Sequence, residues 1–379
     1  MCRGDDLTAR SSAQSGSAPH GGIRRALWQY ADVVARNGVV LLRAQRRPTV
    51  DDVAGHAGVS TSTASRALSG RGYVSPAVRE RVRASVQALG YVPHLNARNL
   101  RTGSTSDVGV VVSNLRDTFY SELATAIELS LRAHGYNMIL MTDGGDEATG
   151  LAVLDTLMAK RVAGVILTPV STAVVKRLLT NDIPVVQADR IVRGQRTDAV
   201  VGDNVQGALD ATAHLIAHGH RSIAMLIDES RWTTGRNRLK GFRDAHRSAG
   251  LLLDDRLIVF APGSVAAIRA EVGRLLEAQP EVTAILAGNG LLAEGAFAEL
   301  QTRRLRLPQQ MSLVAYDDVP WMAMVRPGIT AVAQHTDDIG RACAEKLVAR
   351  LTGDGDRLPT VTSVAPSLRV RGSVRRFSA

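Results

Sequence analysis

One short helical pattern in this chain combines hydroxyl side chains with an arginine. Thr61–Leu68 carries Thr61, Ser62, Ser65 and Arg66 on its outward side. Small hydroxyl side chains let a helix backbone approach the major groove of DNA, and an arginine can donate two hydrogen bonds to guanine. A helix facing bulk solvent would carry more Glu and Lys. This face therefore favours base reading over a role in a generic three-helix bundle.

The flanking residues predict two further helices that position this one. Thr49 and Asp52 have the spacing of a capping box, so a helix is expected to start there and to end at Gly58. Ser60 can cap the second helix, and the pair Ser75-Pro76 can start a third. Two short helices joined by a glycine-containing turn, followed by a packing helix, are typical of a helix-turn-helix DNA-binding domain over residues 48–92.

The charge of the chain is concentrated at its amino-terminal end. Residues 1–104 carry 15 arginines, no lysine and 6 acidic residues, which accounts for nine of the ten net positive charges. A basic segment on a neutral body indicates a module that binds a polyanion, although a basic tail or a targeting segment would also be basic. Residues 1–47 have no clear periodicity, and we expect a disordered extension or a misassigned start.

From residue 107 the chain alternates between strand and helix patterns, which predicts an α/β core of doubly wound parallel sheets. The expected strands are Val108–Val112, Met138–Met141, Gly164–Leu167, Val185–Ala188, Ile223–Ile227, Ala284–Ala287 and Ser312–Tyr316. The expected helices include Tyr120–His134, Val205–His218, Leu239–Ala249, Ala266–Ala278 and Leu291–Arg303. Residues 107–379 exceed one comfortable sheet, so we expect two lobes with a ligand in the cleft between them.

The composition excludes several classes of protein. The chain is 45% hydrophobic and 22% charged, which excludes a mainly disordered protein, and it has no apolar stretch of the length a membrane helix needs. Cys2 and Cys343 cannot form a disulfide framework or a four-thiolate zinc site, so a reducing, cytoplasmic setting is expected. We identify no catalytic residues, metal ligands or cofactor.

Two patterns resemble ligand-binding motifs but lack residues that such motifs need. Gly288-Asn289-Gly290 with Ala293 follows a strand and opens a helix, as in a dinucleotide site, but no acidic residue follows at the required spacing. His218 and His220 have a metal-like spacing but no third ligand nearby, which favours structural roles.

Motifs in order along the chain resemble those of the lactose-repressor/galactose-repressor (LacI/GalR) family of bacterial transcription regulators. The resemblance covers about residues 48–370. It rests on the residues from Thr49 to Leu68 and on Leu89–Pro93, Gly202–Asn204, His218–Arg221, Gly241-Phe242, Tyr316–Asp318 and Ile329–Val332. It implies a helix-turn-helix head, then a hinge helix and linker over residues 93–106, followed by a core like a periplasmic binding protein. Lobe 1 would span about residues 107–202 plus 334–362, and lobe 2 about 203–333 plus 363–379.

The resemblance also implies which residues contact DNA. Thr61, Ser62 and Arg66 match base-reading positions, while Thr49, Ser60, Thr63 and Ser65 match polar positions in the head that include its phosphate contacts. In the hinge, Leu100 matches a leucine that wedges into a base step of the minor groove. The other implied hinge contacts are His94, Ala97 and Arg98, of which His94 replaces the usual Asn.

For the core, the resemblance implies an effector cleft. The residues that match it are Ser113, Phe119, Thr168, Asp189, Arg238, Phe260, Asn289, Asp317 and Gln334. Carboxylates, amides and one arginine can make directional bonds to sugar hydroxyls. Each Asp could instead cap a helix or close a turn, and Phe119 and Phe260 could be plain core residues.

The expected function is that of a cytoplasmic, homodimeric regulator, most simply a repressor. It would bind double-stranded operator DNA and respond to a small-molecule effector, a sugar or sugar derivative before a nucleoside or purine, with no membrane involvement. A sugar-binding transport protein and an enzyme on doubly wound sheets are the alternatives. The basic head argues against the first, and the missing catalytic set argues against the second.

Overall fold

The computed structural model describes residues 48–70, 72–91, 105–192, 194–228, 232–261, 263–354 and 358–376. The chain divides into two compact units, Met1–Arg98 and Asn99–Ala379, which we call the head and the core. The expected hinge residues His94, Ala97, Arg98 and Leu100 lie outside the described residues, as does the extension 1–47.

The head contains the three helices that the sequence predicts: α2 (Val50–Ala57), α3 (Thr61–Ser69) and α4 (Pro76–Leu89). The capping box is confirmed, because the Thr49 hydroxyl accepts from the backbone N–H of Asp52 while the Asp52 carboxylate accepts from the N–H of Thr49 at 2.7 Å. Gly58 ends α2 in the left-handed conformation at φ 64°. Apolar side chains from α2 and α4 form a small core, in which Val53 and Val82 are fully buried.

The core contains two six-stranded sheets, each of which forms the centre of a lobe. In lobe 1 the order is β11-β5-β4-β3-β1-β2, with every neighbouring pair parallel. These strands are β1 Asp107–Val112, β2 Asn137–Thr142, β3 Gly164–Leu167, β4 Val185–Ala188, β5 Asp198–Gly202 and β11 Val361–Val364. In lobe 2 the order is β12-β10-β9-β8-β6-β7, and β12 alone among its described strands is antiparallel to its neighbour. These strands are β6 Ile223–Ile227, β7 Ile258–Phe260, β8 Ala284–Ala287, β9 Ser312–Tyr316, β10 Thr330–Ala333 and β12 Ser367–Arg369.

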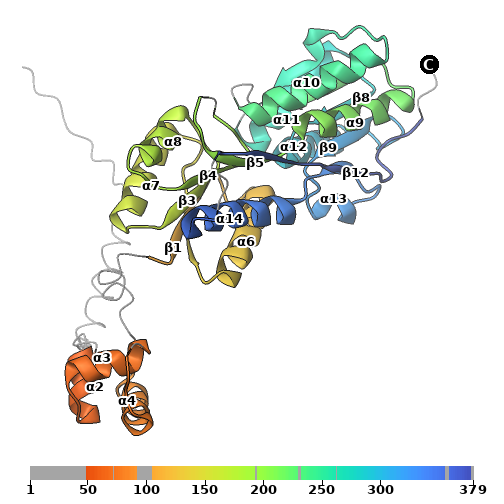
Figure 1. The fold of residues 1–379 in the computed structure, drawn as a ribbon. Coiled ribbons are helices and arrows are strands. Elements are labelled where there is room, and N and C mark those ends of the chain that lie inside the picture. Colours follow the sequence, from red (N-terminus) through yellow and green to blue (C-terminus); the bar gives the residue numbers. More distant parts are fainter. Residues whose placement is uncertain are drawn as a thin grey trace, which may run out of the picture. The chain divides into compact units, whose positions relative to one another are not determined.

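Helices cover both faces of each sheet, which confirms the doubly wound architecture (Figure 1). In lobe 1, α6 and α14 pack on the face that contains Val110, whereas α7 and α8 pack on the face that contains Val111. These helices are α6 Thr118–Ala133, α7 Glu147–Ala159, α8 Thr172–Leu179 and α14 Thr336–Thr352. Because successive side chains point to opposite faces, an uninterrupted apolar strand is buried on both sides.

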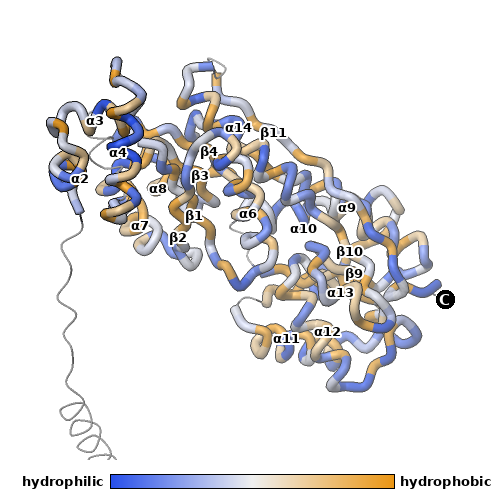
Figure 2. The backbone as a smooth tube through the Cα atoms, turned by 90° about the horizontal axis from the view of Figure 1, so that it is seen from below, coloured by the Kyte–Doolittle hydropathy of each residue, from blue (hydrophilic) through white to orange (hydrophobic). Residues whose placement is uncertain are grey.

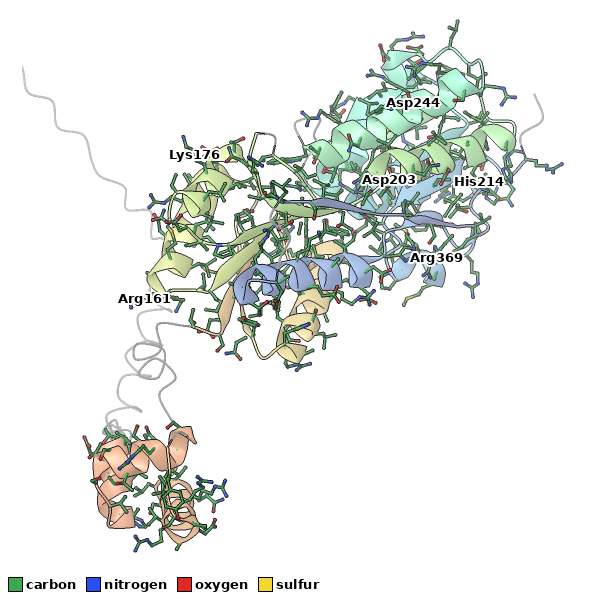
Figure 3. The ribbon with its side chains drawn as sticks, viewed as in Figure 1. Arg161, Lys176, Asp203, His214, Asp244 and Arg369 are labelled. Carbon is green, nitrogen blue, oxygen red and sulfur yellow. The ribbon has the colours of Figure 1, made fainter. Side chains whose placement is uncertain are left out.

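Lobe 2 repeats this arrangement. Its helices are α9 Asn204–Ala217, α10 Thr233–Ser248, α11 Val265–Ala278, α12 Gly290–Thr302 and the short α13 Trp321–Met324. A pair formed by α9 and α10 covers one face, and α11 with α12 covers the other. The Asp203 carboxylate caps α9 by accepting from the N–H of Gln206 at 3.0 Å, and Figure 3 shows Asp203 and His214 near opposite ends of that helix. In Figure 2, α10 is coloured largely as hydrophilic, and its buried residues include Phe242 and Ala245.

The chain passes between the lobes three times: after β5, after β10 and between β11 and β12. Strand β11 runs to Val364, so the lobe boundary suggested at residue 362 falls inside a strand. The third passage connects β11 at the edge of one sheet to β12 at the edge of the other.

Helices α9 and α10 approach so closely that only glycine fits at one position of their contact. A Cβ atom on Gly241 would lie 2.2 Å from the carbonyl oxygen of Val205 and 2.9 Å from the backbone nitrogen of Leu209. Both atoms belong to the backbone of α9, so neither can rotate away.

We predict that Gly241→Ala lowers the free energy of unfolding of the core by about 3 kcal/mol, because the added methyl group overpacks two backbones. Urea titration of the full chain measures this. The same substitution at Gly55, where a Cβ meets no atom within 4 Å, is the control and should be neutral or slightly stabilising. An unchanged urea midpoint for Gly241→Ala would contradict the packing described here.

Candidate functional site

Helix α3 presents a row of polar side chains to solvent. Thr61, Ser62 and Arg66 are exposed, whereas Ala64 on the opposite side is fully buried. The Arg66 guanidinium lies back along the helix, with Nε 3.4 Å from the carbonyl oxygen of Ser62 and Nη2 3.4 Å from the hydroxyl of Thr63. These are long hydrogen bonds, so the guanidinium can exchange them for acceptors on a nucleic acid at little cost.

Hydroxyl groups gather at the amino-terminal end of α3. The Ser60 hydroxyl caps the helix through the N–H of Thr63 and lies 2.9 Å from the hydroxyls of both Ser62 and Thr63. The Thr61 hydroxyl donates to the Asp51 carboxylate at 2.7 Å. A helix amino terminus lined with hydroxyl and N–H donors suits contact with phosphate oxygens. Thr49 and Ser65 flank this group and are partly buried.

In the core, six of the expected effector residues are the first or the second residue after a strand. In lobe 1 these are Ser113, Thr168 and Asp189, and in lobe 2 they are Asn289, Asp317 and Gln334. The carboxyl ends of parallel strands meet at one edge of a sheet, where ligands bind in doubly wound folds. Asp189 and Asp317 both have left-handed backbones, at φ 66° and 67°, a conformation that aspartate tolerates better than most residues.

On the lobe 1 side, Asp189 and Arg190 form a buried network. The Tyr120 hydroxyl donates to Asp189 Oδ2 at 3.3 Å, and Arg190 Nη2 donates to the Tyr120 hydroxyl at 2.7 Å. Arg190 Nη1 lies 3.4 Å from the Ser113 hydroxyl, and Arg190 Nε lies 3.7 Å from Asp189 Oδ2. Asp189 and Ser113 are therefore brought together, through a tyrosine and an arginine that the sequence analysis did not single out.

On the lobe 2 side, Arg238 is held by three groups. Its Nε donates to Asn204 Oδ1 at 2.7 Å, its Nη1 donates to the carbonyl oxygen of Gly288 at 2.5 Å, and its guanidinium lies 3.8 Å from the centre of the Tyr316 ring. Arg238 thus lies at the carboxyl ends of β8 and β9. Much of its hydrogen-bonding capacity, however, is used to hold the protein together.

Asp317 joins the remaining lobe 2 residues. Its Oδ1 accepts from Gln334 Nε2 at 2.6 Å, and its Oδ2 accepts from the N–H of Gly290 at 3.3 Å. Asn289 caps α12 through the N–H of Leu292 and donates to Asp228 Oδ2 at 3.0 Å. The glycine-rich segment therefore positions a capping amide.

The two aromatic candidates have different surroundings. Phe119 is 5% exposed and packs edge-on against Tyr120, with ring centres 5.2 Å apart. Phe260 ends the edge strand β7 and is 48% exposed. None of the polar contacts described for the other eight effector candidates includes it.

Five buried polar atoms of this region have no hydrogen-bond partner among the described residues. They are Asp189 Oδ1, Thr168 Oγ1, Arg190 Nε, the Tyr316 hydroxyl and Gln334 Oε1. A buried polar atom without a partner is costly, so such atoms point to a ligand or to ordered water. Two of the five can only accept, two are hydroxyls and Arg190 Nε can only donate, so a ligand with groups that both donate and accept would satisfy them.

Carboxylates from both lobes act on one another here. The pKa of Asp117, the residue that caps α6, is raised to about 6 by burial first and then by the charges of Asp317 and Asp189. Burial also raises the pKa of Asp189. Burial disfavours the charged form of Arg238, but Asp317 and other carboxylates outweigh this and hold its pKa above the usual arginine value.

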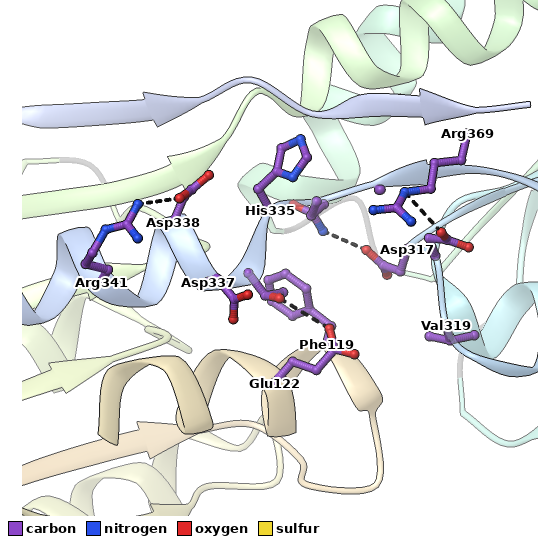
Figure 4. Close-up of a pocket in the computed structure, with 13 residues that line it drawn as sticks. Phe119, Glu122, Asp317, Val319, His335, Asp337, Asp338, Arg341 and Arg369 are labelled. Atoms are coloured by element: carbon purple, nitrogen blue, oxygen red, sulfur yellow. Dashed lines mark hydrogen bonds and ion pairs between the residues drawn. The ribbon is translucent and has the colours of Figure 1, made fainter. Parts of the chain in front are cut away.

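A cavity of about 430 Å³ opens beside this cluster. Figure 4 shows Phe119 and Glu122 from α6, Asp317 from the loop after β9, and Asp337 from the first turn of α14 around it. Of the nine expected effector residues, Phe119, Asp317 and Gln334 line this cavity, and Ser113 lines a second one near Arg116 and Thr142.

The two histidines with metal-like spacing, His218 and His220, have different surroundings. His220 is fully buried and bonds through Nδ1 to the Thr283 hydroxyl at 2.8 Å. His218 instead pairs with His214, with ring centres 4.3 Å apart. Within the described part of the chain, no group of three or more metal-binding side chains is found, and no helix is long and apolar enough to cross a membrane.

Comparison with known proteins gives two family matches. Residues 49–94 match the model of bacterial regulatory proteins of the lacI family. Residues 105–366 match the model of periplasmic binding proteins and sugar-binding domains of the LacI family. The ribose operon repressor of Escherichia coli K12 is 32% identical over 336 residues, covering 86% of this chain and 99% of the repressor.

A second curated relative is the regulator CelR of Thermobifida fusca, 32% identical over 83% of this chain and 94% of its own length. Among solved structures, a complex of CelR with cellobiose superimposes with a TM-score of 0.66 at 30% identity, covering 86% of this chain and all of that one. A lac repressor dimer bound to operator and an anti-inducer superimposes with a TM-score of 0.78 at 24% identity, over 87% of this chain and all of that one, which shows the shared fold.

We predict that Asp117→Asn stabilises the protein above pH 6. The pKa of Asp117 is higher in the folded protein than its ordinary value of 3.8, so its stabilising contribution is complete below about pH 4 and is lost as the pH rises through about 6. Asparagine does not titrate and can still cap α6. The variant should gain at most about 3 kcal/mol at pH 7.5 and progressively less toward pH 4.

Urea titrations of both proteins between pH 4 and 7.5 measure this difference. A stability difference that does not change with pH would contradict the burial of this carboxylate.

Proposed function

Because the chain belongs to the LacI family of bacterial regulatory proteins, we propose that it represses transcription by binding a pseudopalindromic operator as a homodimer, under the control of a sugar or sugar derivative. One observation carries the proposal: the chain that holds a solvent-facing polar helix α3 also holds unpartnered acceptors at the strand ends of a two-lobed core. Repression, rather than activation, follows the relatives that are named repressors.

We assign base reading to Thr61, Ser62 and Arg66, with α3 in the major groove. Thr49, Ser60, Thr63 and Ser65 would hold the head in position on the DNA backbone. The hinge residues His94, Ala97, Arg98 and Leu100 would bind the minor groove, with Leu100 opening a central base step. Two heads on one dimer would read two half-sites related by the dimer axis.

We assign the effector site to the cleft between the lobes. Ser113, Phe119, Thr168, Asp189, Arg238, Asn289, Asp317 and Gln334 are its proposed residues, and Phe260 stays a weaker candidate. Asp117, Asp189, Asp228 and Asp317 outnumber Arg190 and Arg238, and both guanidiniums already have protein partners. An uncharged sugar, whose hydroxyls can donate to the unpartnered acceptors, therefore fits better than a sugar phosphate.

The proposed mechanism is a coupling free energy between these two sites. An effector that prefers one arrangement of the lobes shifts the population toward it, and the two hinge segments of the dimer can then order on DNA more or less readily. We propose that the protein acts in the cytoplasm, where its operator would be, and that it acts by binding rather than by catalysis, as its named relatives do.

Selection from random DNA duplexes at about 150 mM salt tests the DNA-binding part of the proposal. We expect enrichment of a palindrome of roughly 14–20 base pairs with a flexible pyrimidine–purine step at its centre. The matched variant Arg66→Ala should lose preference at one base pair in each half-site, at a cost of about 1–3 kcal/mol. If wild-type protein enriches no sequence, with or without added sugars, the proposal is wrong. If Arg66→Ala enriches the same sequence equally strongly, Arg66 does not read a base.

The effector assignment is tested by Asp317→Ala. This carboxylate holds Gln334 and the start of α12, so its loss should abolish the response of operator binding to sugar. Operator affinity without sugar should be unchanged, since the head is a separate unit. Titration of the operator complex with D-ribose, cellobiose and ribose 5-phosphate measures the response. An Asp317→Ala protein that responds like the wild type would exclude this cleft, and a stronger response to the phosphate would exclude an uncharged effector.

A further inference from the structure

Trp232 belongs to lobe 2 in sequence but packs on lobe 1. It directly precedes α10, and its side chain contacts the apolar cluster formed by α7, α8 and the face of the lobe 1 sheet that they cover. Val192, which follows β4, contacts the same cluster. The indole of Trp232 therefore packs at the periphery of the core of lobe 1, although the residue belongs to lobe 2.

The guanidinium of Arg190 lies on the face of this indole. Its central carbon is 4.4 Å from the centre of the Trp232 ring, a distance typical of a cation–π interaction. The Arg190 side chain is only 11% exposed. Such interactions strengthen when water is excluded, so this contact is stronger than one on an open surface.

A hydrogen bond next to the ring contact also joins the lobes. The N–H of Ile191 donates to the Thr233 hydroxyl at 3.2 Å. Two consecutive residues after β4 thus contact two consecutive residues at the start of α10. On its other side Arg190 is fixed within lobe 1 by the Tyr120 hydroxyl at 2.7 Å.

We propose that Trp232 and Arg190 form an interlobe latch that positions the two halves of the effector site. The latch rests on the proposed function in one respect, because the two halves that it positions are those of the proposed sugar cleft. Arg190 also contacts Ser113 and Asp189, which are proposed effector residues, so a sugar bound to them is adjacent to the group that holds Trp232. The latch therefore raises the population of the arrangement that binds the effector, and its loss lowers effector affinity by the same factor.

The first experiment measures the latch itself and needs no sugar. In the full chain, Trp28→Phe and Trp321→Phe leave Trp232 as the one remaining tryptophan. Arg190→Ala in this background removes the cation that covers the indole face. We expect the acrylamide quenching constant of Trp232 to rise at least about twofold. An unchanged constant would overturn the latch, whatever the protein does with operator or sugar.

The second experiment measures the effect of the latch on effector affinity. Calorimetric titration with D-ribose and cellobiose compares the wild type with Trp232→Ala, Trp232→Phe and the control Trp321→Phe, which removes an indole that stacks on Phe297 in lobe 2, at 5.2 Å between ring centres. We expect about tenfold weaker binding in Trp232→Ala, a smaller loss in Trp232→Phe, and wild-type affinity in the control. Equal affinity in Trp232→Ala and the wild type would overturn the proposal.

Two features of the design separate the possible failures. Trp232→Phe and Arg190→Met keep most of the side-chain volume, and Arg190→Met removes the cation, so they report on the latch even if the alanine variants fold poorly. Operator affinity without sugar should be unchanged in the control Trp321→Phe. A wild-type protein that binds no operator contradicts the proposed function, whereas the quenching result decides the latch by itself.

Discussion

The geometry of parallel strands is the constraint on which the rest of this structure depends. All strands of the lobe 1 sheet run in one direction, so the residues that follow them gather at one edge. The lobe 2 sheet does the same, apart from its antiparallel edge strand β12. Ser113 and Asp317 lie about 200 residues apart in the chain, yet both stand directly after a strand, each at the carboxyl edge of its own sheet. Buried carboxylates with raised pKa values, left-handed aspartates and unpartnered acceptors all occur at these edges.

The sequence predicts the architecture well because burial on both faces leaves long apolar runs. Gly164–Leu167, Val185–Ala188 and Ala284–Ala287 are strands with the expected bounds. Other strands were not predicted. Strand β5 begins with Asp198 and ends with Gly202, and β11 mixes Thr and Ser with Val at an exposed edge, so neither gives a clear apolar pattern. Within the site, Asp189 was expected from the family resemblance, whereas its neighbour Arg190 was not, although both stand just after β4. Trp232 has no such signal, because its contact with lobe 1 depends on the packing of segments about 40 residues apart.

Two units with different physical demands are joined in this chain. The head needs small hydroxyl side chains on α3 and few buried groups, and its stability rests on caps and a small apolar core. The core buries charged groups between its lobes, where their cost is offset by networks around Arg190 and Arg238. Such networks tolerate few geometries, so a change in lobe arrangement would be a choice between discrete states. This is the property that an effector-controlled DNA-binding protein requires.

In the proposed mechanism, operator binding and effector binding share one coupling free energy. Its most direct test is calorimetric measurement of D-ribose affinity, and of cellobiose affinity, with the free protein and with the protein saturated by its selected operator. Thermodynamic linkage predicts that operator changes sugar affinity by the same factor, and in the same direction, as sugar changes operator affinity. A sugar that binds with equal affinity to the free and the operator-bound protein, while operator affinity also stays constant, would contradict the account.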